Sequence, residues 1–239
     1  MGRKSQVDDP NLSIVSESVG ASSGQSINKI RPEDRPAHDW YRFVLSFPPH
    51  LVREYVEKFG VRPHQTVLDP FCGTGTTLVE CRKLGIRGIG IERNPVACFA
   101  ARVKIKWDID PDGLLEHAYR VSEVASTRFY SEGTGERDMP LFSSNRRCNA
   151  KLRSLTEECV DLILKNSISP LPLHKTLVLL DVLSESGDSR FADHERLALA
   201  KTIVFGASNL HFGPEVGVGR AKEDAPVVRL WLENVATIA

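Results

Sequence analysis

The segment from Thr66 to Glu92 constrains the fold more than any other part of the chain. Its first residues, Thr66–Asp69, predict a short buried strand, and Gly88–Glu92 predicts a second strand. A turn that contains two glycines, followed by a helix over residues 75–84, connects the two strands. Because two short strands joined by one helix pair in parallel through a right-handed crossover, this unit predicts an α/β fold.

The turn between the strands reads Asp69-Pro70-Phe71-Cys72-Gly73-Thr74-Gly75-Thr76-Thr77. Gly73 and Gly75 allow the backbone to approach a ligand closely and to adopt angles that other residues avoid. The turn follows the carboxyl end of a strand and opens a helix, whose free N–H groups suit a carboxylate. No Lys follows Gly75, which disfavours a P-loop, and Leu78 stands where a dinucleotide fingerprint needs a third glycine.

Polar side chains near the turn suggest the rest of the ligand. Asp69 is expected to accept hydrogen bonds from an ammonium group. Glu92 ends the second strand, where an acid commonly accepts hydrogen bonds from ribose hydroxyls. Asn94 has two open roles, a contact with adenine or, as favoured here, an N-cap for the helix that begins at Pro95.

These residues resemble the N4-cytosine/N6-adenine DNA methyltransferase family. The turn Asp69–Thr77 resembles motif I of that family, and Gly88–Glu92 followed by Asn94-Pro95 resembles motif II. The run Ser46–Val52 resembles the segment that precedes motif I in circularly permuted members. The resemblance covers about residues 38–105 and implies an enzyme that moves a methyl group from S-adenosylmethionine to an exocyclic amine of flipped adenine or cytosine.

The resemblance also implies the partners and the cofactor site. DNA is the expected substrate of the complete enzyme, within a restriction-modification context. The residues expected to bind S-adenosylmethionine are Phe47, Pro48, Asp69, Pro70, Phe71, Gly73, Thr74, Gly75, Thr76, Thr77, Glu92 and Asn94.

The family's catalytic loop, Asp/Asn/Ser-Pro-Pro followed by an aromatic residue, has no match in this sequence. The single Pro-Pro pair, Pro48-Pro49, has Phe47 in the polar position and His50 in the aromatic position. Cytosine-C5 chemistry would need a nucleophilic Cys, usually after Pro, and Cys72 is interpreted as a packing residue. We therefore assign no catalytic residue. We expect an N-terminal, cofactor-binding part, with the catalytic loop and remaining strands in a following or separate C-terminal chain.

The expected architecture is an incomplete Rossmann-like methyltransferase fold with a mostly helical C-terminal insertion. Residues 1–37 are rich in Ser, Gly, Asp and Pro and predict a disordered tail. Residues 38–108 form the predicted cofactor-binding half, and residues 109–239 the helical region, for which target recognition is one role. The predicted helices there are Leu114–Phe129, Lys151–Lys165, His174–Leu183, His194–Ala207 and Ala225–Ile238.

Two features of the helical region remain open. Helix and strand compete for residues 176–180 and 202–205, since short apolar runs fit both. A basic cluster suits either DNA phosphates or, as favoured here, a solvated helix face; its members are Arg146, Arg147, Lys151 and Arg153.

Composition narrows the class of protein further. The 31 basic and 31 acidic side chains cancel, so no global field draws the chain to nucleic acid. The five cysteines form no C-x-x-C pair, and no metal site is predicted. No apolar run reaches the roughly 20 residues that span a bilayer, so we expect no membrane contact and a cytoplasmic location. Two other functions stay open: a catalytically inactive cofactor-binding or regulatory subunit, and an RNA amine methyltransferase.

Overall fold

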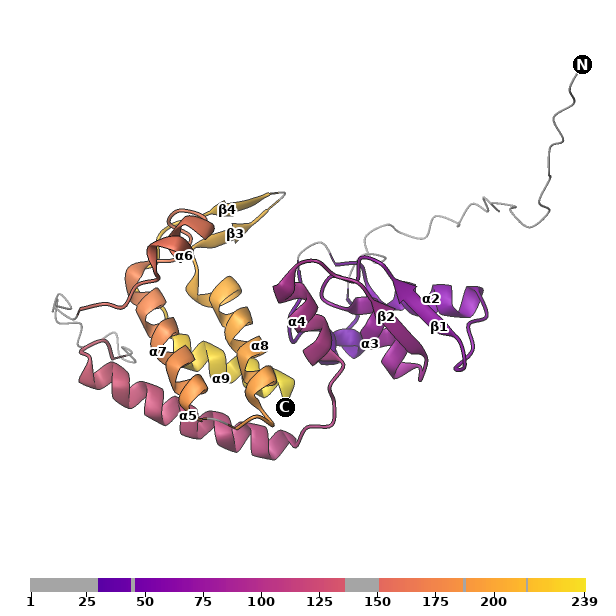
Figure 1. The fold of residues 1–239 in the computed structure, drawn as a ribbon, viewed down its shortest axis with the longest axis horizontal. Helices are drawn as coiled ribbons and strands as arrows, with labels where there is room; N and C mark the ends of the chain where they lie inside the picture. The colour runs from indigo at the N-terminus through magenta and orange to yellow at the C-terminus, as the bar shows by residue number, and fades with distance from the viewer. Residues whose placement is uncertain (1–29, 44–45, 136–150, 187, 214) are drawn as a thin grey trace, which may run out of the picture.

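A computed structural model describes residues 30–43, 46–135, 151–186, 188–213 and 215–239 (Figure 1). An α/β part lies beside a helical part, and the long helix α5 runs along the base of the helical part. In chain order the elements are η1 (Pro32–Asp34), α1 (Arg35–His38), α2 (Pro49–Lys58), β1 (Thr66–Asp69), α3 (Thr76–Lys83), β2 (Arg87–Gly90), α4 (Pro95–Lys104), α5 (Pro111–Ser131), α6 (Glu157–Leu162), α7 (Pro170–Ser186), α8 (Ala192–Thr202), η3 (Ile203–Ala207), β3 (Leu210–Phe212), β4 (Val216–Val218) and α9 (Val227–Ile238).

The predicted parallel strand pair is confirmed, although β2 ends at Gly90, two residues before Glu92. β1 and β2 pair in parallel, with Thr66 opposite Arg87 and Asp69 opposite Gly90. α3 packs on one face of this pair, above the small residues of β2. A Cβ atom added to Gly90 would lie 2.8 Å from the Leu78 side chain, so glycine allows the helix to approach.

The other face of the β1–β2 pair carries large apolar side chains. Successive side chains of a strand point to opposite faces, so Leu68 and Ile89 lie on the face away from α3, and Ile91 continues their row. Leu68 is 59% exposed, Ile89 43% and Ile91 57%. In the described part of the chain the sheet has two strands.

Order begins earlier in the chain than the sequence predicts. Residues 30–37 belong to the expected disordered tail, yet they include η1 and the start of α1, with Asp34 and Ala37 buried. The reason is a set of distant partners: Asp34 accepts hydrogen bonds from Arg53, and His38 bonds to Glu80. Local composition carries no signal of such contacts. Residues 1–29 of the expected tail lie outside the described residues.

Residues 109–239 are mostly helical in the structure where they are described, with two differences from the predicted elements. The ambiguous residues 176–180 and 202–205 are helical, within α7 and across α8 and η3. The helix predicted at Lys151–Lys165 is too long, because only α6 forms there. Before α6, the backbone N–H of Arg153 donates to the His174 ring and not to a helical carbonyl. The antiparallel hairpin β3–β4 was not predicted, since three-residue strands show too little periodicity.

The two parts share one hydrophobic core. Val79 of α3 and Val103 of α4 belong to the same buried cluster as Trp231 of α9. The segment before α2 also contacts α8: Lys201 donates to the carbonyl of Asp39 at 2.6 Å, and the Trp40 ring meets His194 edge-on. The helical region therefore packs on the α3–α4 side of the sheet. No helix in the described ranges combines the length and apolar character that crossing a membrane requires.

Candidate functional site

The turn after β1 has the backbone geometry that its glycines suggest. Gly73 has φ +52° and Gly75 has φ +86°, both in the left-handed region. Gly75 is the N-cap residue of α3, and its N–H donates to the carbonyl of Cys72 at 2.8 Å. Because α3 has no side-chain cap, the N–H groups of its first turn remain available to a ligand.

Asp69 holds the turn together at both ends. One carboxylate oxygen accepts the N–H of Phe71 at 3.0 Å, and the other accepts the Thr77 hydroxyl at 2.6 Å. A carboxylate accepts up to about four hydrogen bonds, so these two leave capacity for a ligand ammonium group. Asp69 therefore fixes the loop whether or not it also binds a ligand.

Glu92 connects the end of β2 to the turn. Its Oε2 accepts the N–H of Gly73 at 2.9 Å, and its Oε1 accepts the N–H of Asn94 at 2.7 Å. The structure thus brings together the acid and the Gly turn that the sequence places apart. Of the two roles open for Asn94, the cap is observed, since its Oδ1 accepts the N–H groups of Val96 and Ala97.

The other predicted site residues differ in exposure. The rings of Phe47 and Phe71 are exposed, and Pro70 is also exposed, whereas Pro48 is buried at the start of α2. The remaining ones are buried within the turn and the first turn of α3: Thr74, Thr76 and Thr77.

Sequence reasoning missed a buried charged cluster behind the turn. Glu80 of α3 is fully buried and bonds to His38 at 2.7 Å, Arg53 at 2.5 Å and Lys83 at 2.9 Å. Arg53 also binds Asp34 at 2.7 Å. The cluster ties α1 and α2 to α3, and so holds the Phe47–Pro48 segment near the turn's own helix. Its only local signal is a Glu between Val79 and Cys81 on a helix face that is otherwise buried.

Burial and hydrogen bonding oppose each other at Glu80. Burial raises the pKa of Glu80, but hydrogen bonds from His38, Lys83 and Arg53 outweigh it and lower that pKa to about 2. Burial lowers the pKa of His38, so this ring is neutral at pH 7 and donates an N–H to the carboxylate. The cluster is therefore ionic between Glu80, Arg53 and Lys83 at neutral pH.

Cys72 and His50, the two residues considered for catalysis in the sequence, are both buried. The sulfur of Cys72 lies against Gly90, where an added Cβ would meet it at 2.7 Å, and burial raises the pKa of this thiol. Cys72 is therefore a packing residue, as expected. His50 is buried in the first turn of α2.

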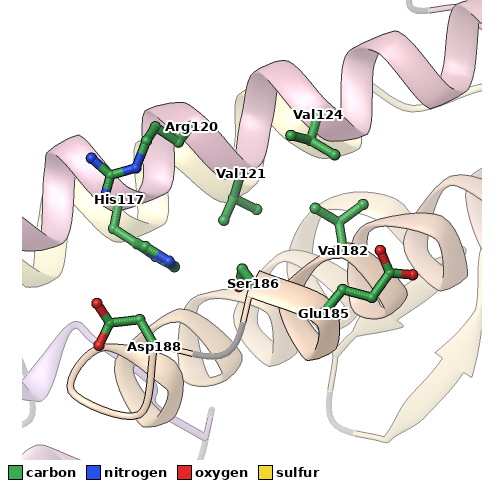
Figure 2. A pocket seen from close by; sticks show the side chains of 8 residues that line it. All are labelled: His117, Arg120, Val121, Val124, Val182, Glu185, Ser186 and Asp188. Carbon is green, nitrogen blue, oxygen red and sulfur yellow. The ribbon is translucent and has the colours of Figure 1, made fainter.

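A cavity of about 430 Å³ lies in the helical region, between α5 and the end of α7 (Figure 2). Its charged walls are already paired: His117 bonds to Glu195, and Arg120 to Glu116. Asp188 and Glu185 also bind arginines, so the walls offer no unpaired charge for a ligand. The cavity is lined by His117, Arg120, Val121, Val124, Val182, Glu185, Ser186 and Asp188.

Of the two described members of the basic cluster, Lys151 is exposed and Arg153 is engaged in ion pairs. Arg153 pairs with Asp181 and Glu132, which leaves its guanidinium poorly placed for a phosphate. Arg146 and Arg147 lie outside the described residues. This pairing fits the favoured interpretation, in which the cluster is a surface feature of the helical region.

The region that contains the turn is similar to known methyltransferases. A family model described as DNA methylase matches residues 11–102. The chain is 32% identical over 100 residues to the Type II methyltransferase M.BsoBI of Geobacillus stearothermophilus, a match that covers 40% of this chain and 19% of that protein. It is 42% identical over 73 residues to the Type II methyltransferase M.MjaII of Methanocaldococcus jannaschii, covering 30% of this chain and 14% of that protein.

A relative that modifies RNA also matches. The chain is 34% identical over 79 residues to a tRNA (guanine(10)-N2)-dimethyltransferase of Methanothermobacter thermautotrophicus, covering 33% of this chain and 22% of that protein. The chain thus spans less than a quarter of the length of each of these three curated relatives. No solved structure matches the chain.

Proposed function

We propose that this chain is the S-adenosylmethionine-binding part of a DNA amino-methyltransferase of the N4-cytosine/N6-adenine kind, since residues 11–102 match the DNA methylase family model. One observation carries the proposal: the hydrogen bond from Gly73 to Glu92. It joins the Gly turn after β1 to the acid that follows β2. Open parallel sheets bind nucleotides in the crevice at these ends of the strands.

The polar groups of this crevice suit three parts of the cofactor: the carboxylate, the ammonium group and the ribose. The first N–H groups of α3 suit the methionine carboxylate, and Asp69 suits the ammonium group. Glu92 has lone pairs for the ribose hydroxyls beyond the two N–H groups that it already accepts. When bound, the cofactor supplies a methyl group made reactive by its sulfonium. This chain's own residues bind and orient it.

The catalytic step is assigned to another polypeptide segment. In the proposed reaction the methyl group passes to an exocyclic amine of adenine or cytosine in DNA. A complementing C-terminal chain supplies the Pro-Pro loop that accepts hydrogen bonds from that amine, and DNA binds to the complete enzyme. We expect the present chain alone to bind the cofactor without methylating DNA.

The decisive experiment separates binding from catalysis. Calorimetric titration tests whether the chain binds S-adenosylmethionine, and mass spectrometry of DNA bases after co-expression with the complementing segment tests methylation. Binding with methylated DNA supports the proposal. Binding without methylation by any complementing segment favours the inactive regulatory subunit instead. The tRNA-modifying relative supports the remaining alternative, which predicts unmodified DNA and methylated bases in RNA, measured by mass spectrometry of the RNA bases.

Substituting Glu92 tests the ribose contact. Glu92→Ala should weaken S-adenosylmethionine binding by about 1–3 kcal/mol, because hydrogen bonds to a charged group are lost. The same change frees the N–H of Gly73, which loosens the turn. Calorimetric titration measures the effect.

Asn94→Ala is the matched control. It removes the α4 cap and should cost about 1 kcal/mol of unfolding free energy, while cofactor affinity changes less than in Glu92→Ala. If the two variants weaken binding equally, Glu92 supports binding by holding the backbone of the turn and not by a hydrogen bond to the ribose.

A further inference from the structure

A histidine of the helical region has one ring nitrogen bound and the other free. His117 of α5 is buried, and its Nδ1 lies 2.7 Å from a carboxylate oxygen of Glu195 in α8. Its Nε2 has no hydrogen-bond partner among the described residues, and it is not one of their buried unpaired atoms. The 7% of this side chain that stays exposed therefore includes Nε2. Since His117 lines the cavity between α5 and α7, Nε2 faces that cavity (Figure 2).

Neighbouring groups fix the His117 ring in this position. The Phe191 ring lies 5.7 Å from it, measured between ring centroids. Glu195 is itself held, because its side chain is 1% exposed and its backbone carbonyl accepts the indole N–H of Trp231 at 3.0 Å. A carboxylate at one ring nitrogen sets the direction in which the other nitrogen points. Folding has already ordered the ring, so a ligand that bonds to Nε2 loses little side-chain entropy there.

The cavity has an apolar inner wall and a charged rim. Val121 and Val182 line it and are only 2% and 3% exposed. Arg120 and Glu185 line it as well, but their side chains are 56% and 57% exposed, which places them at the mouth. The volume of about 430 Å³ lies within the range of about 300–1,000 Å³ that is usual for small-molecule sites. The space therefore suits a ring-sized ligand that meets apolar side chains inside.

The charges around the cavity are neutralised within the chain. Arg120 pairs with Glu116 at 2.6 Å, and Asp188 pairs with Arg190 at 2.7 Å. A charged ligand would lose hydration and find no free counter-charge, whereas a neutral ligand avoids that cost. Nε2 of His117 is then the polar atom that a neutral ligand can bond to. A hydroxyl group suits Nε2 in either tautomer of the ring, because a hydroxyl both donates and accepts.

We propose that this cavity binds a small neutral molecule with an apolar, ring-sized body and one hydroxyl group, which forms a hydrogen bond with Nε2 of His117. The apolar body contacts Val121 and Val182. The site is separate from the cofactor turn, since it lies between α5 and α7 of the helical region, whereas the turn follows β1 in the α/β part. The inference does not depend on the proposed function.

Titration of the full chain with three ring compounds at pH 7 tests the proposal. Nuclear magnetic resonance of the imidazole nitrogens follows binding. Phenol should bind and shift the Nε2 resonance of His117. Toluene has a similar size but no hydroxyl, so it should bind about tenfold more weakly, because it leaves Nε2 without a partner. Benzoate should not bind at concentrations that saturate the site with phenol. No shift with phenol, equal affinity for phenol and toluene, or binding of benzoate as tight as that of phenol overturns the proposal.

A substitution separates Nε2 from the bond that holds the ring. In His117→Asn the amide nitrogen takes the place of Nδ1, so the contact with Glu195 is kept while no atom replaces Nε2. The affinity for phenol should fall about tenfold, to that for toluene, and the affinity for toluene should stay as in the parent chain. His211→Asn, on the exposed strand β3, is the control and should bind phenol like the parent chain.

Parental affinity for phenol in His117→Asn overturns the proposal. If His117→Asn fails to fold, the comparison of phenol with toluene on the parent chain decides the question by itself.

Discussion

Titration of the Gly75→Val chain with S-adenosylmethionine should give no measurable heat of binding. Gly75 has φ +86°, a conformation that a β-branched residue avoids. A Cβ at this position would also lie 2.9 Å from the Cβ and 3.0 Å from the Cα of Ala101 in α4. Either the turn or α4 must move, and the first turn of α3 moves with it. The sequence alone suggested that a side chain here would block the ligand; in the structure it would first collide with α4.

A pair of matched variants separates lost binding from lost folding. Gly73 has φ +52° and Gly60 has φ +60°, and a Cβ at either position would meet nothing within 4 Å. Gly73→Ala and Gly60→Ala should therefore each cost about 1–2 kcal/mol of backbone strain. Only Gly73→Ala should weaken cofactor binding, because Gly60 lies two residues after the end of α2, outside the turn. Parental affinity in both Gly73→Ala and Gly75→Val would place the cofactor elsewhere.

Glu80→Gln should lower the unfolding free energy by about 3–5 kcal/mol, the usual cost of breaking a buried ion pair. The variant leaves Arg53 and Lys83 without the carboxylate that now lies 2.5 Å and 2.9 Å from them. For a chain of this size, such a loss corresponds to a decrease of about 10 °C in the midpoint of thermal unfolding. Circular dichroism during heating at pH 7 measures it.

An exposed glutamate provides the control for Glu80. Glu116 pairs with Arg120 on the surface of α5, where its side chain is 74% exposed, so Glu116→Gln should change the unfolding free energy by about 0.5 kcal/mol or less. Similar losses in the two variants would show that the buried cluster contributes no more than a surface pair.

The pH dependence of the Glu80 contribution follows from its pKa. The pKa is lowered from 4.5 to about 2 on folding, so the stabilisation is fully present above pH 4.5 and is lost as the pH falls toward 2. The difference in unfolding free energy between the parent chain and Glu80→Gln should therefore shrink over that window. A difference that stays constant from pH 6 to pH 3 would contradict the assignment.

The signals that predicted the cofactor turn are local in sequence. Short-range sequence patterns are enough to predict β1, the Gly turn, α3 and the Asn94 cap, because each depends on residues that are close together in the sequence. The contacts that escaped prediction are distant. His38 and Glu80 are 42 residues apart, and neither the order of residues 30–37 nor the burial of Glu80 follows from neighbouring residues. The strands β3 and β4 escaped for a different reason, since three-residue strands show too little periodicity.

The bond from Lys201 to the carbonyl of Asp39 has a consequence for biosynthesis, since it joins residues 162 positions apart. Non-local contacts form late and slow the folding of a chain. At ribosomal rates of about 5–20 residues per second, roughly 8 to 30 seconds pass between synthesis of the two residues. During that interval the segment that leads into α2 lacks its α8 support, and nascent chains stalled before residue 201 should be cut by protease near Asp39 more readily than released ones.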